Sequence, residues 1–295
     1  MRCKLCANEK ISIIYDGVIR NGGLGKYTQN NVPIYQCEGC RVIWHEKLFS
    51  DMATYYESEK YREELEGTAD EEQFYDLHDK ETLDKLSYTG TDIFRHKIVA
   101  DIGCGCGAFL DYLSGVAKII IAVEPSESYR KILSRKGFRV YAYAEETLNN
   151  YGGGVDVVTS FDVIEHVEDP TVFMDNIYKL LSVGGRAIIG TPTDAPIMRT
   201  LLGEVYERKL LFSTQHLWIF SEHNLRTLAE NAGFSKIGIK YFQRYGIGNM
   251  LGWIRDKKPG TNITDVFISE TLDGVWKGQC SDRGLADYIV LYVEK

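Results

Sequence analysis

The sequence has few of the features that mark disordered, membrane or nucleic-acid-binding chains. It contains only 6 prolines among 295 residues, and 44% of its residues are hydrophobic, which excludes an extended disordered chain. Its apolar runs, such as residues 118–123, are far shorter than the ~20 residues that a membrane helix needs. No basic run exceeds the pair Lys257 and Lys258, and the net charge is −8, so binding to nucleic acid is not expected.

The N-terminus also lacks an apolar segment ahead of its first cysteines, so a cleaved secretion signal is not expected. We therefore expect a soluble, cytoplasmic protein. In a reducing compartment, the seven cysteines are expected to be metal ligands, core residues or catalytic groups rather than disulfides.

Four of the cysteines form two pairs near the N-terminus. Cys3 and Cys6 make one C-x-x-C pair and Cys37 and Cys40 the other, and four thiolates suit tetrahedral zinc. The alternatives are two unrelated reduced pairs or a redox pair, but a redox pair needs a βαβ context that is absent here. We predict a structural zinc ion that folds residues 1–50 as a small module and leaves no coordination position open for catalysis.

The following stretch, residues 51–96, carries tyrosines among charged residues at helical spacing, which predicts a helical connector. Its Tyr55, Tyr56 and Tyr61 either close over a ligand as a lid or pack the connector against the core. Packing is the favoured interpretation, because aromatic residues at helical spacing usually serve a core.

From residue 97 onward, strand-type and helix-type segments alternate. This pattern predicts an α/β domain over residues 97–295, with a doubly wound and mostly parallel sheet. Asp169 and Pro170 are predicted to start one helix, and Gly184 with Gly185 to follow its last turn. The predicted strands are 98–101, 117–123, 138–143, 155–161, 186–190, 236–242 and 288–293, and the predicted helices are 108–114, 126–135, 170–181 and 221–232.

The stretch 244–284 is too long for a plain hairpin loop and is rich in large apolar residues. We expect it to form a helical flap that shapes the substrate pocket or the face of a homodimer.

A glycine-rich turn follows the first predicted strand of this domain. Gly103, Gly105 and Gly107 alternate with cysteines and precede a helix, which is typical of a close approach of backbone to ligand. Read loosely, the spacing also satisfies the dinucleotide fingerprint, so an NAD enzyme is an alternative. However, the carboxylate of Asp101 would repel a pyrophosphate and attract the ammonium and sulfonium groups of S-adenosylmethionine. Glu124, at the end of the second strand, can accept both ribose hydroxyls of either cofactor.

Together, these motifs resemble those of class I S-adenosylmethionine-dependent methyltransferases over about residues 97–240. The resemblance implies a seven-stranded sheet whose last strand is antiparallel, and nine cofactor-binding residues: Asp101, Gly103, Gly105, Gly107, Glu124, Pro125, Ala144, Glu145 and Phe161. The first four would face the methionine part, Glu124 the ribose and Glu145 the adenine amino group. Glu145 is followed by Glu146, and either is alternatively a surface acid.

Two histidines are candidate catalytic residues. His216 follows the fifth strand of the domain, where substrate loops belong, and a histidine accepts a proton near neutral pH. The alternative is that His216 packs under Trp218 and bonds to backbone. His166 is the second candidate, and its alternative is to cap, with Glu165, the helix near Pro170.

The order of domains adds a looser resemblance to sugar C-methyltransferases, which act on nucleotide-linked keto-sugars. Those enzymes carry Glu-His where this sequence has Gln215 and His216, and their further C-terminal domain has no counterpart here. We expect methyl transfer from S-adenosylmethionine to a small-molecule acceptor, a nucleotide-linked sugar or other carbohydrate-type metabolite, at carbon or oxygen. The alternatives are a non-catalytic zinc-containing scaffold and an RNA methyltransferase, which the charge of −8 disfavours.

Overall fold

The structure is a computed structural model that describes residues 1–46, 48, 52–58, 71–260, 263 and 268–295. Its chain divides into two compact units. The first comprises Met1–Leu48, Thr191–Thr227 and Ile239–Val290, and the second comprises Phe49–Gly190, Leu228–Gly238 and Leu291–Lys295. Among the described residues, none of the helices combines the length and the apolar character that crossing a lipid bilayer requires.

A seven-stranded sheet of the order β10-β11-β8-β7-β4-β5-β6 confirms the predicted α/β fold. The pairings between β4 and β5, β4 and β7, β5 and β6, and β7 and β8 are all parallel. Most residues of β4 and β5 are buried, as expected for parallel strands that are covered on both faces. The strands are β4 (Ile98–Ile102), β5 (Ile119–Val123), β6 (Arg139–Tyr141), β7 (Val155–Phe161), β8 (Leu181–Pro192), β10 (Lys236–Phe242) and β11 (Tyr288–Glu294).

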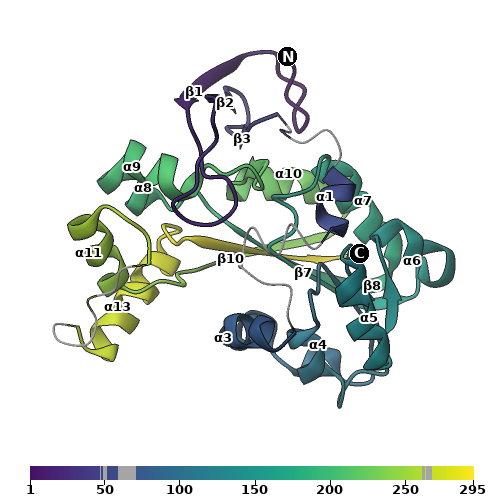
Figure 1. Ribbon diagram of the computed structural model, residues 1–295. Coiled ribbons are helices and arrows are strands. Elements are labelled where there is room, and N and C mark those ends of the chain that lie inside the picture. The colour runs from purple at the N-terminus through teal and green to yellow at the C-terminus, as the bar shows by residue number, and fades with distance from the viewer. Residues whose placement is uncertain (47, 49–51, 59–70, 261–262, 264–267) are drawn as a thin grey trace. The chain divides into compact units, whose positions relative to one another are not determined.

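The helices of the second unit alternate with its strands. In Figure 1, α3 and α4 lie below the strands and α7 lies above them. Asp169 caps α7 by accepting hydrogen bonds from the amides of Thr171 and Val172, and Pro170 is the first helical residue, as predicted. The helices are α1 (Met52–Glu57), α3 (Glu71–Thr89), α4 (Ala108–Leu113), α5 (Glu127–Arg135), α6 (Ala144–Tyr151) and α7 (Pro170–Leu180), and α10 (Glu222–Ala232) follows later in the chain.

The structure differs from the sequence prediction for this region in two ways. The first is that α7 ends at Leu180 and β8 begins at once, so Gly184 and Gly185 lie within a strand. The pairing of β7 with β8 shifts register there, and Gly184 adopts a φ of 77°, as in a bulge that only glycine enters freely. The second is that our prediction omits α6, whose first residues are Ala144 and Glu145.

The first unit holds a four-stranded sheet of the order β1-β2-β3-β9, with antiparallel pairings. Its strands are β1 (Ile11–Gly17), β2 (Val32–Cys37), β3 (Ile43–Trp44) and β9 (Trp218–Ile219). Apolar side chains from this sheet and from later helices share one core, which includes Ile19, Ile34, Tyr206, Phe212 and Trp253. The N-terminal strands are therefore packed against segments almost 200 residues away in sequence.

The predicted flap contains helices, namely α11 (Ile247–Asp256) and α13 (Glu270–Asp282). Asp273 of α13 accepts a hydrogen bond of 2.8 Å from the amide of Ile247 and so caps the start of α11. Residues 261–262 and 264–267 of the flap lie outside the described residues. The rest of the first unit includes α8 (Pro196–Leu202), α9 (Glu204–Tyr206) and a π-helical turn, Glu207–Leu211.

Candidate functional site

The glycine turn between β4 and α4 needs glycine for steric reasons, as Gly103 and Gly105 illustrate. Gly103 has a φ of 79°, and a Cβ there would lie 2.2 Å from Cγ2 of Val163. Gly105 has a φ of 57°, and a Cβ there would lie 2.6 Å from the ring of Phe74. Any side chain at either position would both strain the backbone and displace a neighbour.

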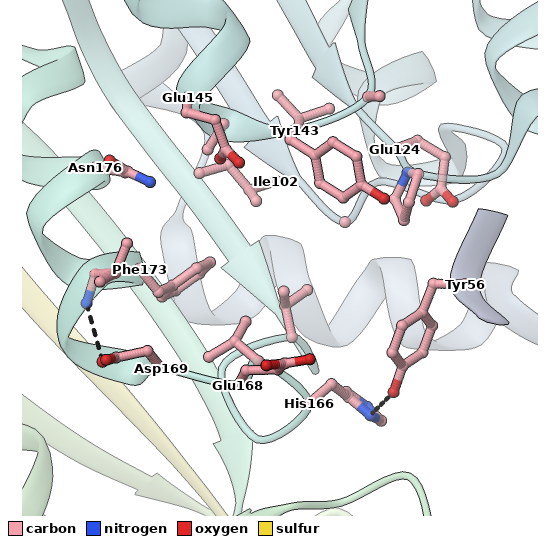
Figure 2. A pocket seen from close by; sticks show the side chains of 18 of the residues that line it. Tyr56, Ile102, Glu124, Tyr143, Glu145, His166, Glu168, Asp169, Phe173 and Asn176 are labelled. Atoms are coloured by element: carbon pink, nitrogen blue, oxygen red, sulfur yellow. Dashed lines mark hydrogen bonds between the residues drawn. The ribbon is translucent and has the colours of Figure 1, made fainter. Parts of the chain in front are cut away.

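A cavity of about 410 Å³ opens beside this turn, within the second unit (Figure 2). Its walls come from residues 102–103 at the end of β4, 123–125 at the end of β5 and 142–145 after β6. The loop after β7, the first turns of α7 and Tyr56 of α1 complete it. Parallel α/β sheets bind ligands at this edge, outside the carboxyl ends of the strands and near the point where the strand order reverses.

The cavity wall is strongly acidic. Five carboxylates line it, and none of the described residues that line it is lysine or arginine. These acids are Glu124, Glu145, Asp162, Glu168 and Asp169. A pyrophosphate would be repelled by such a wall, whereas a sulfonium or ammonium group would be attracted. The charge of the site therefore argues against the dinucleotide alternative.

Glu124 links the end of β5 to the glycine turn. Its side chain is buried, and its two carboxylate oxygens accept hydrogen bonds of 2.9 Å from the backbone amides of Gly105 and Ser126. Each carboxylate oxygen can accept a second hydrogen bond. Since Glu124 also lines the cavity, the carboxylate is fixed in a position where it can receive two hydroxyl groups.

Asp101 is buried in β4, two residues before the turn. The hydroxyl of Thr159, on the neighbouring strand, donates a hydrogen bond of 2.7 Å to its carboxylate. Burial raises the pKa of Asp101 to about 6, although the positive charge of Lys85 and the hydrogen bond from Thr159 act in the opposite direction. The ionised carboxylate of Asp101 therefore lowers the stability of the folded protein.

This burial gives a testable dependence of stability on pH. Because the folded-state pKa of Asp101 exceeds its ordinary value of 3.8, the folded protein holds this proton more tightly, and the group lowers stability as pH rises from about 4 to 6. We expect Asp101→Asn, which keeps an acceptor for Thr159, to raise the free energy of unfolding by about 3 kcal/mol at pH 7.5 but only about 1 kcal/mol at pH 4.5.

Urea unfolding at both pH values measures this difference. Asp79→Asn, at an exposed position on α3, is the control and should change stability by less than about 0.5 kcal/mol at either pH. An equal gain for Asp101→Asn at both pH values would contradict a cost due to the charge.

The structure gathers five of the nine predicted cofactor-binding residues on the cavity wall: Gly103, Glu124, Pro125, Ala144 and Glu145. The other four are not among the described residues that line it. Phe161, one of them, is buried with its ring centroid 5.9 Å from that of Phe109 and 6.3 Å from that of Tyr88.

Sequence reasoning missed other lining residues. Tyr143 lies between β6 and α6 and directly precedes Ala144, so its place next to a predicted cofactor-binding residue was the available signal. Asn176 lines the cavity from within α7, near Glu145 at the far end from Tyr56 (Figure 2). It carries no motif that could have marked it.

His166 and Tyr56 meet at one side of the cavity, as Figure 2 shows. The Tyr56 hydroxyl lies 3.0 Å from Nδ1 of His166, and the two rings are nearly perpendicular. Because Asp169 caps α7, the alternative in which His166 performs this capping does not hold. Tyr56 lines the cavity and so does more than pack the connector, while Tyr61 lies outside the described residues.

His216 belongs to the first unit and is half-buried. Its backbone amide donates a hydrogen bond of 3.2 Å to the hydroxyl of Ser213, and the neighbouring Gln215 is buried. The catalytic role of His216 stays a prediction.

The four N-terminal cysteines converge in the first unit. Their sulfur atoms all lie within 4.8 Å of one another, with Cys3 and Cys40 at 3.6 Å and Cys6 and Cys37 at 3.5 Å. A tetrahedron with Zn–S bonds of about 2.3 Å has sulfur atoms about 3.8 Å apart. The four thiols therefore fit one tetrahedral metal ion, whereas a disulfide would need sulfurs at about 2.05 Å.

The two cysteine pairs also share one backbone conformation. The amide of Ala7 donates to the carbonyl of Cys3 at 2.9 Å, and the amide of Arg41 donates to the carbonyl of Cys37 at 3.0 Å. Ala7 and Arg41, each directly after the second cysteine of its pair, have φ values of 60° and 63°. Two unrelated stretches thus form the same tight turn, which aims two sulfurs from each toward a common point.

Comparison with known families identifies the domain that holds this cavity. A family model described as a methyltransferase domain matches residues 70–238, more than half of the chain. The chain belongs to this methyltransferase family. Its seven-stranded sheet is that of the class I methyltransferase fold, as the resemblance in the sequence implied.

Curated relatives match this methyltransferase over part of their length. The ubiquinone biosynthesis O-methyltransferase of a Caulobacter species is 35% identical over 110 residues, which cover 35% of this chain and 43% of that protein. A probable S-adenosylmethionine-dependent methyltransferase of Mycolicibacterium smegmatis is 28% identical over 192 residues, 61% of this chain and 67% of that protein. The chain spans about two fifths of the length of several ubiquinone-type relatives that it matches.

Among solved structures, an S-adenosylmethionine-dependent methyltransferase from Archaeoglobus fulgidus aligns with a TM-score of 0.51 and 20% identity. The alignment covers 80% of this methyltransferase and 98% of that chain. At this level of identity the similarity shows a common fold.

Proposed function

We propose that this methyltransferase acts on a small-molecule acceptor, and that the acceptor is a nucleotide-linked sugar or another carbohydrate-type metabolite methylated at carbon or oxygen. The main support for placing the cofactor in this cavity is its acidic wall around Glu124. The acceptor class rests on the resemblance of the domain order and cysteine pairing to sugar C-methyltransferases. The relatives named for ubiquinone biosynthesis support a small-molecule acceptor in the broader sense.

The cofactor is proposed to lie along the cavity. Glu124 would accept the two ribose hydroxyls on the lone pairs that the backbone amides leave available, with Pro125 beside it. Glu145, at the opposite end from Tyr56, would receive the adenine amino group, next to Ala144 (Figure 2). Asp101 and the turn of Gly103, Gly105 and Gly107 would face the amino-acid part, and Phe161 would support it. S-adenosylmethionine supplies an electrophilic methyl group on a positively charged sulfur.

The chain's own residues then orient the acceptor and remove a proton. Methyl transfer is an in-line displacement, so the acceptor atom must be held ~3 Å from the methyl carbon in a site that excludes water. His216 is the first proposed base and His166 the second, since an imidazole can take a proton from a hydroxyl or an acidic carbon near neutral pH. Tyr56 fixes the ring of His166 at the cavity wall.

The proposal is tested in two steps. Calorimetry with S-adenosylmethionine tests the cofactor, and micromolar affinity is expected; an absence of binding would overturn the cofactor assignment and favour the scaffold alternative. A screen with a labelled methyl donor, over nucleotide-linked keto-sugars, phenolic acceptors and RNA, tests the acceptor. Methylation of a keto-sugar is expected, and exclusive labelling of a phenol or of RNA would overturn the acceptor class.

We also propose that Cys3, Cys6, Cys37 and Cys40 hold one structural zinc ion. Four cysteine ligands complete its coordination, so the ion would stabilise the fold rather than bind substrate.

A further inference from the structure

The strand that follows the second cysteine pair binds directly to the segment that carries His216. β3 begins three residues after Cys40 and pairs with β9, with Ile43 opposite Ile219 and Trp44 opposite Trp218. The next amide, that of His45, donates a hydrogen bond of 3.2 Å to the carbonyl of Leu217. Three consecutive residues of the cysteine-containing module are therefore aligned with residues 217–219.

His45 extends this contact toward His216. Its side chain is only 4% exposed, and its ring nitrogens face two carbonyl oxygens, that of Glu46 at 2.8 Å and that of Ser213 at 3.0 Å. The hydroxyl of Ser213 in turn accepts a hydrogen bond from the amide of His216. A short chain of hydrogen bonds thus leads from His45 through Ser213 to the backbone of His216.

The N-terminal part of the same segment is held by the loop after β1. The amide of Arg20 donates to the carbonyl of Phe212 at 3.1 Å, and the amide of Thr214 donates to the carbonyl of Arg20 at 2.9 Å. The hydroxyl of Thr214 donates to the side chain of Asn21 at 3.0 Å. Residues 212–219, which we call the His216 segment, have little regular structure of their own, and residues 20–21 and 43–45 bond to its two ends.

The second cysteine pair sets the position of β3. It forms the turn of the β2–β3 hairpin, in which Tyr35 pairs with Trp44, and the amide of Cys37 donates to the carbonyl of Val42 at 3.0 Å. The side-chain amide of Asn224, in α10, donates a hydrogen bond of 2.7 Å to the carbonyl of Cys40. A change in this turn would therefore shift β3 and its partner β9.

We propose that the four-cysteine centre positions the His216 segment for the acceptor, and that His45 is the positioning residue that connects the two. This inference rests on the proposed function, because it takes His216 as a residue that acts on the acceptor. The described residues that line the cofactor cavity belong to the second unit, and the hydrogen bonds named above all lie within the first unit. Metal binding would thus affect the acceptor side and leave the affinity for S-adenosylmethionine unchanged.

Amide hydrogen exchange on the full chain tests this inference without a known acceptor. The samples are the zinc-loaded wild type, the chelator-treated wild type, His45→Leu, His45→Gln and the control His223→Leu, whose histidine is exposed on α10. We expect exchange in residues 212–219 to accelerate by at least about tenfold on zinc removal and in His45→Leu. His45→Gln places an amide donor near the carbonyl of Ser213, so its exchange rate in residues 212–219 should stay within about threefold of wild type. The same rate is expected for His223→Leu.

The measurement includes two internal references. Exchange in β4 and the dissociation constant for S-adenosylmethionine should both stay within about twofold of wild type in every sample. Unchanged exchange in residues 212–219 after zinc removal would overturn the inference. So would equal acceleration in β1 and in residues 212–219, since the module would then unfold as a whole. A wild type that fails to bind S-adenosylmethionine would instead overturn the proposed function and leave the exchange result standing.

Discussion

Replacing Glu124 by alanine is expected to weaken the binding of S-adenosylmethionine by about 100-fold. The substitution removes the proposed acceptor for both ribose hydroxyls, and hydrogen bonds to a charged group contribute about 1.5–3 kcal/mol each. It also leaves the amides of Gly105 and Ser126 without their acceptor, so the glycine turn loses its connection to β5. A loss of about 3 kcal/mol corresponds to this change in dissociation constant, which isothermal titration calorimetry can measure.

Two further variants make the result specific. Glu127→Ala changes an exposed glutamate three residues later, on α5, and should leave the dissociation constant within about twofold of wild type. Glu124→Asp keeps the charge but shortens the side chain by one methylene, and should give a loss of about tenfold. A loss of less than about threefold in Glu124→Ala would show that the ribose lies elsewhere.

The second large effect is expected from loss of one zinc ligand. We expect the wild type to bind one zinc ion per chain and Cys37→Ser to lose it on dialysis against EDTA, because three thiolates hold the ion far more weakly than four. Since binding energy at a structural site is also folding energy, the melting temperature of Cys37→Ser should fall. Metal analysis by mass spectrometry and differential scanning calorimetry measure the two changes.

The chain offers a matched control in Cys280, a buried cysteine of α13 that is remote in sequence from both pairs. Cys280→Ser should keep one zinc ion per chain. The zinc assignment would be refuted by a wild type that neither carries zinc when purified nor takes it up on reconstitution, or by equal zinc contents in the two variants.

Some features at the cavity could be predicted from local sequence patterns. The glycine turn and the cap at Asp169 each depend on backbone conformation or hydrogen bonding within a short stretch, and the structure has these features where the sequence predicts them. The sequence did not predict α6. Gly184 and Gly185 were predicted to follow the end of a helix, but they lie within β8. The same glycines permit a bulge in β8, and only the partner strand β7 distinguishes the two interpretations.

The site around His166 shows where local signals end. Tyr56 and His166 are 110 residues apart, and no periodicity or spacing indicates that their side chains meet. The connector tyrosines looked like packing residues because aromatic spacing on a helix is the same for a core and for a cavity wall. Tyr56 lies on the cavity wall because its hydroxyl contacts His166, in the loop that follows β7.

The amino-acid sequence alone determined the class of this protein: a parallel α/β sheet, a glycine turn flanked by Asp101 and Glu124, and two cysteine pairs that can share a metal ion. These features can be inferred from residue types and from spacings along the chain, such as the alternation of strands and helices and the two C-x-x-C pairs. The tertiary structure alone decided that β3 pairs with β9, that His45 contacts Ser213, and that the cysteine module therefore supports the His216 segment. Such contacts depend on strand register and on packing across more than 160 residues, which no local pattern encodes.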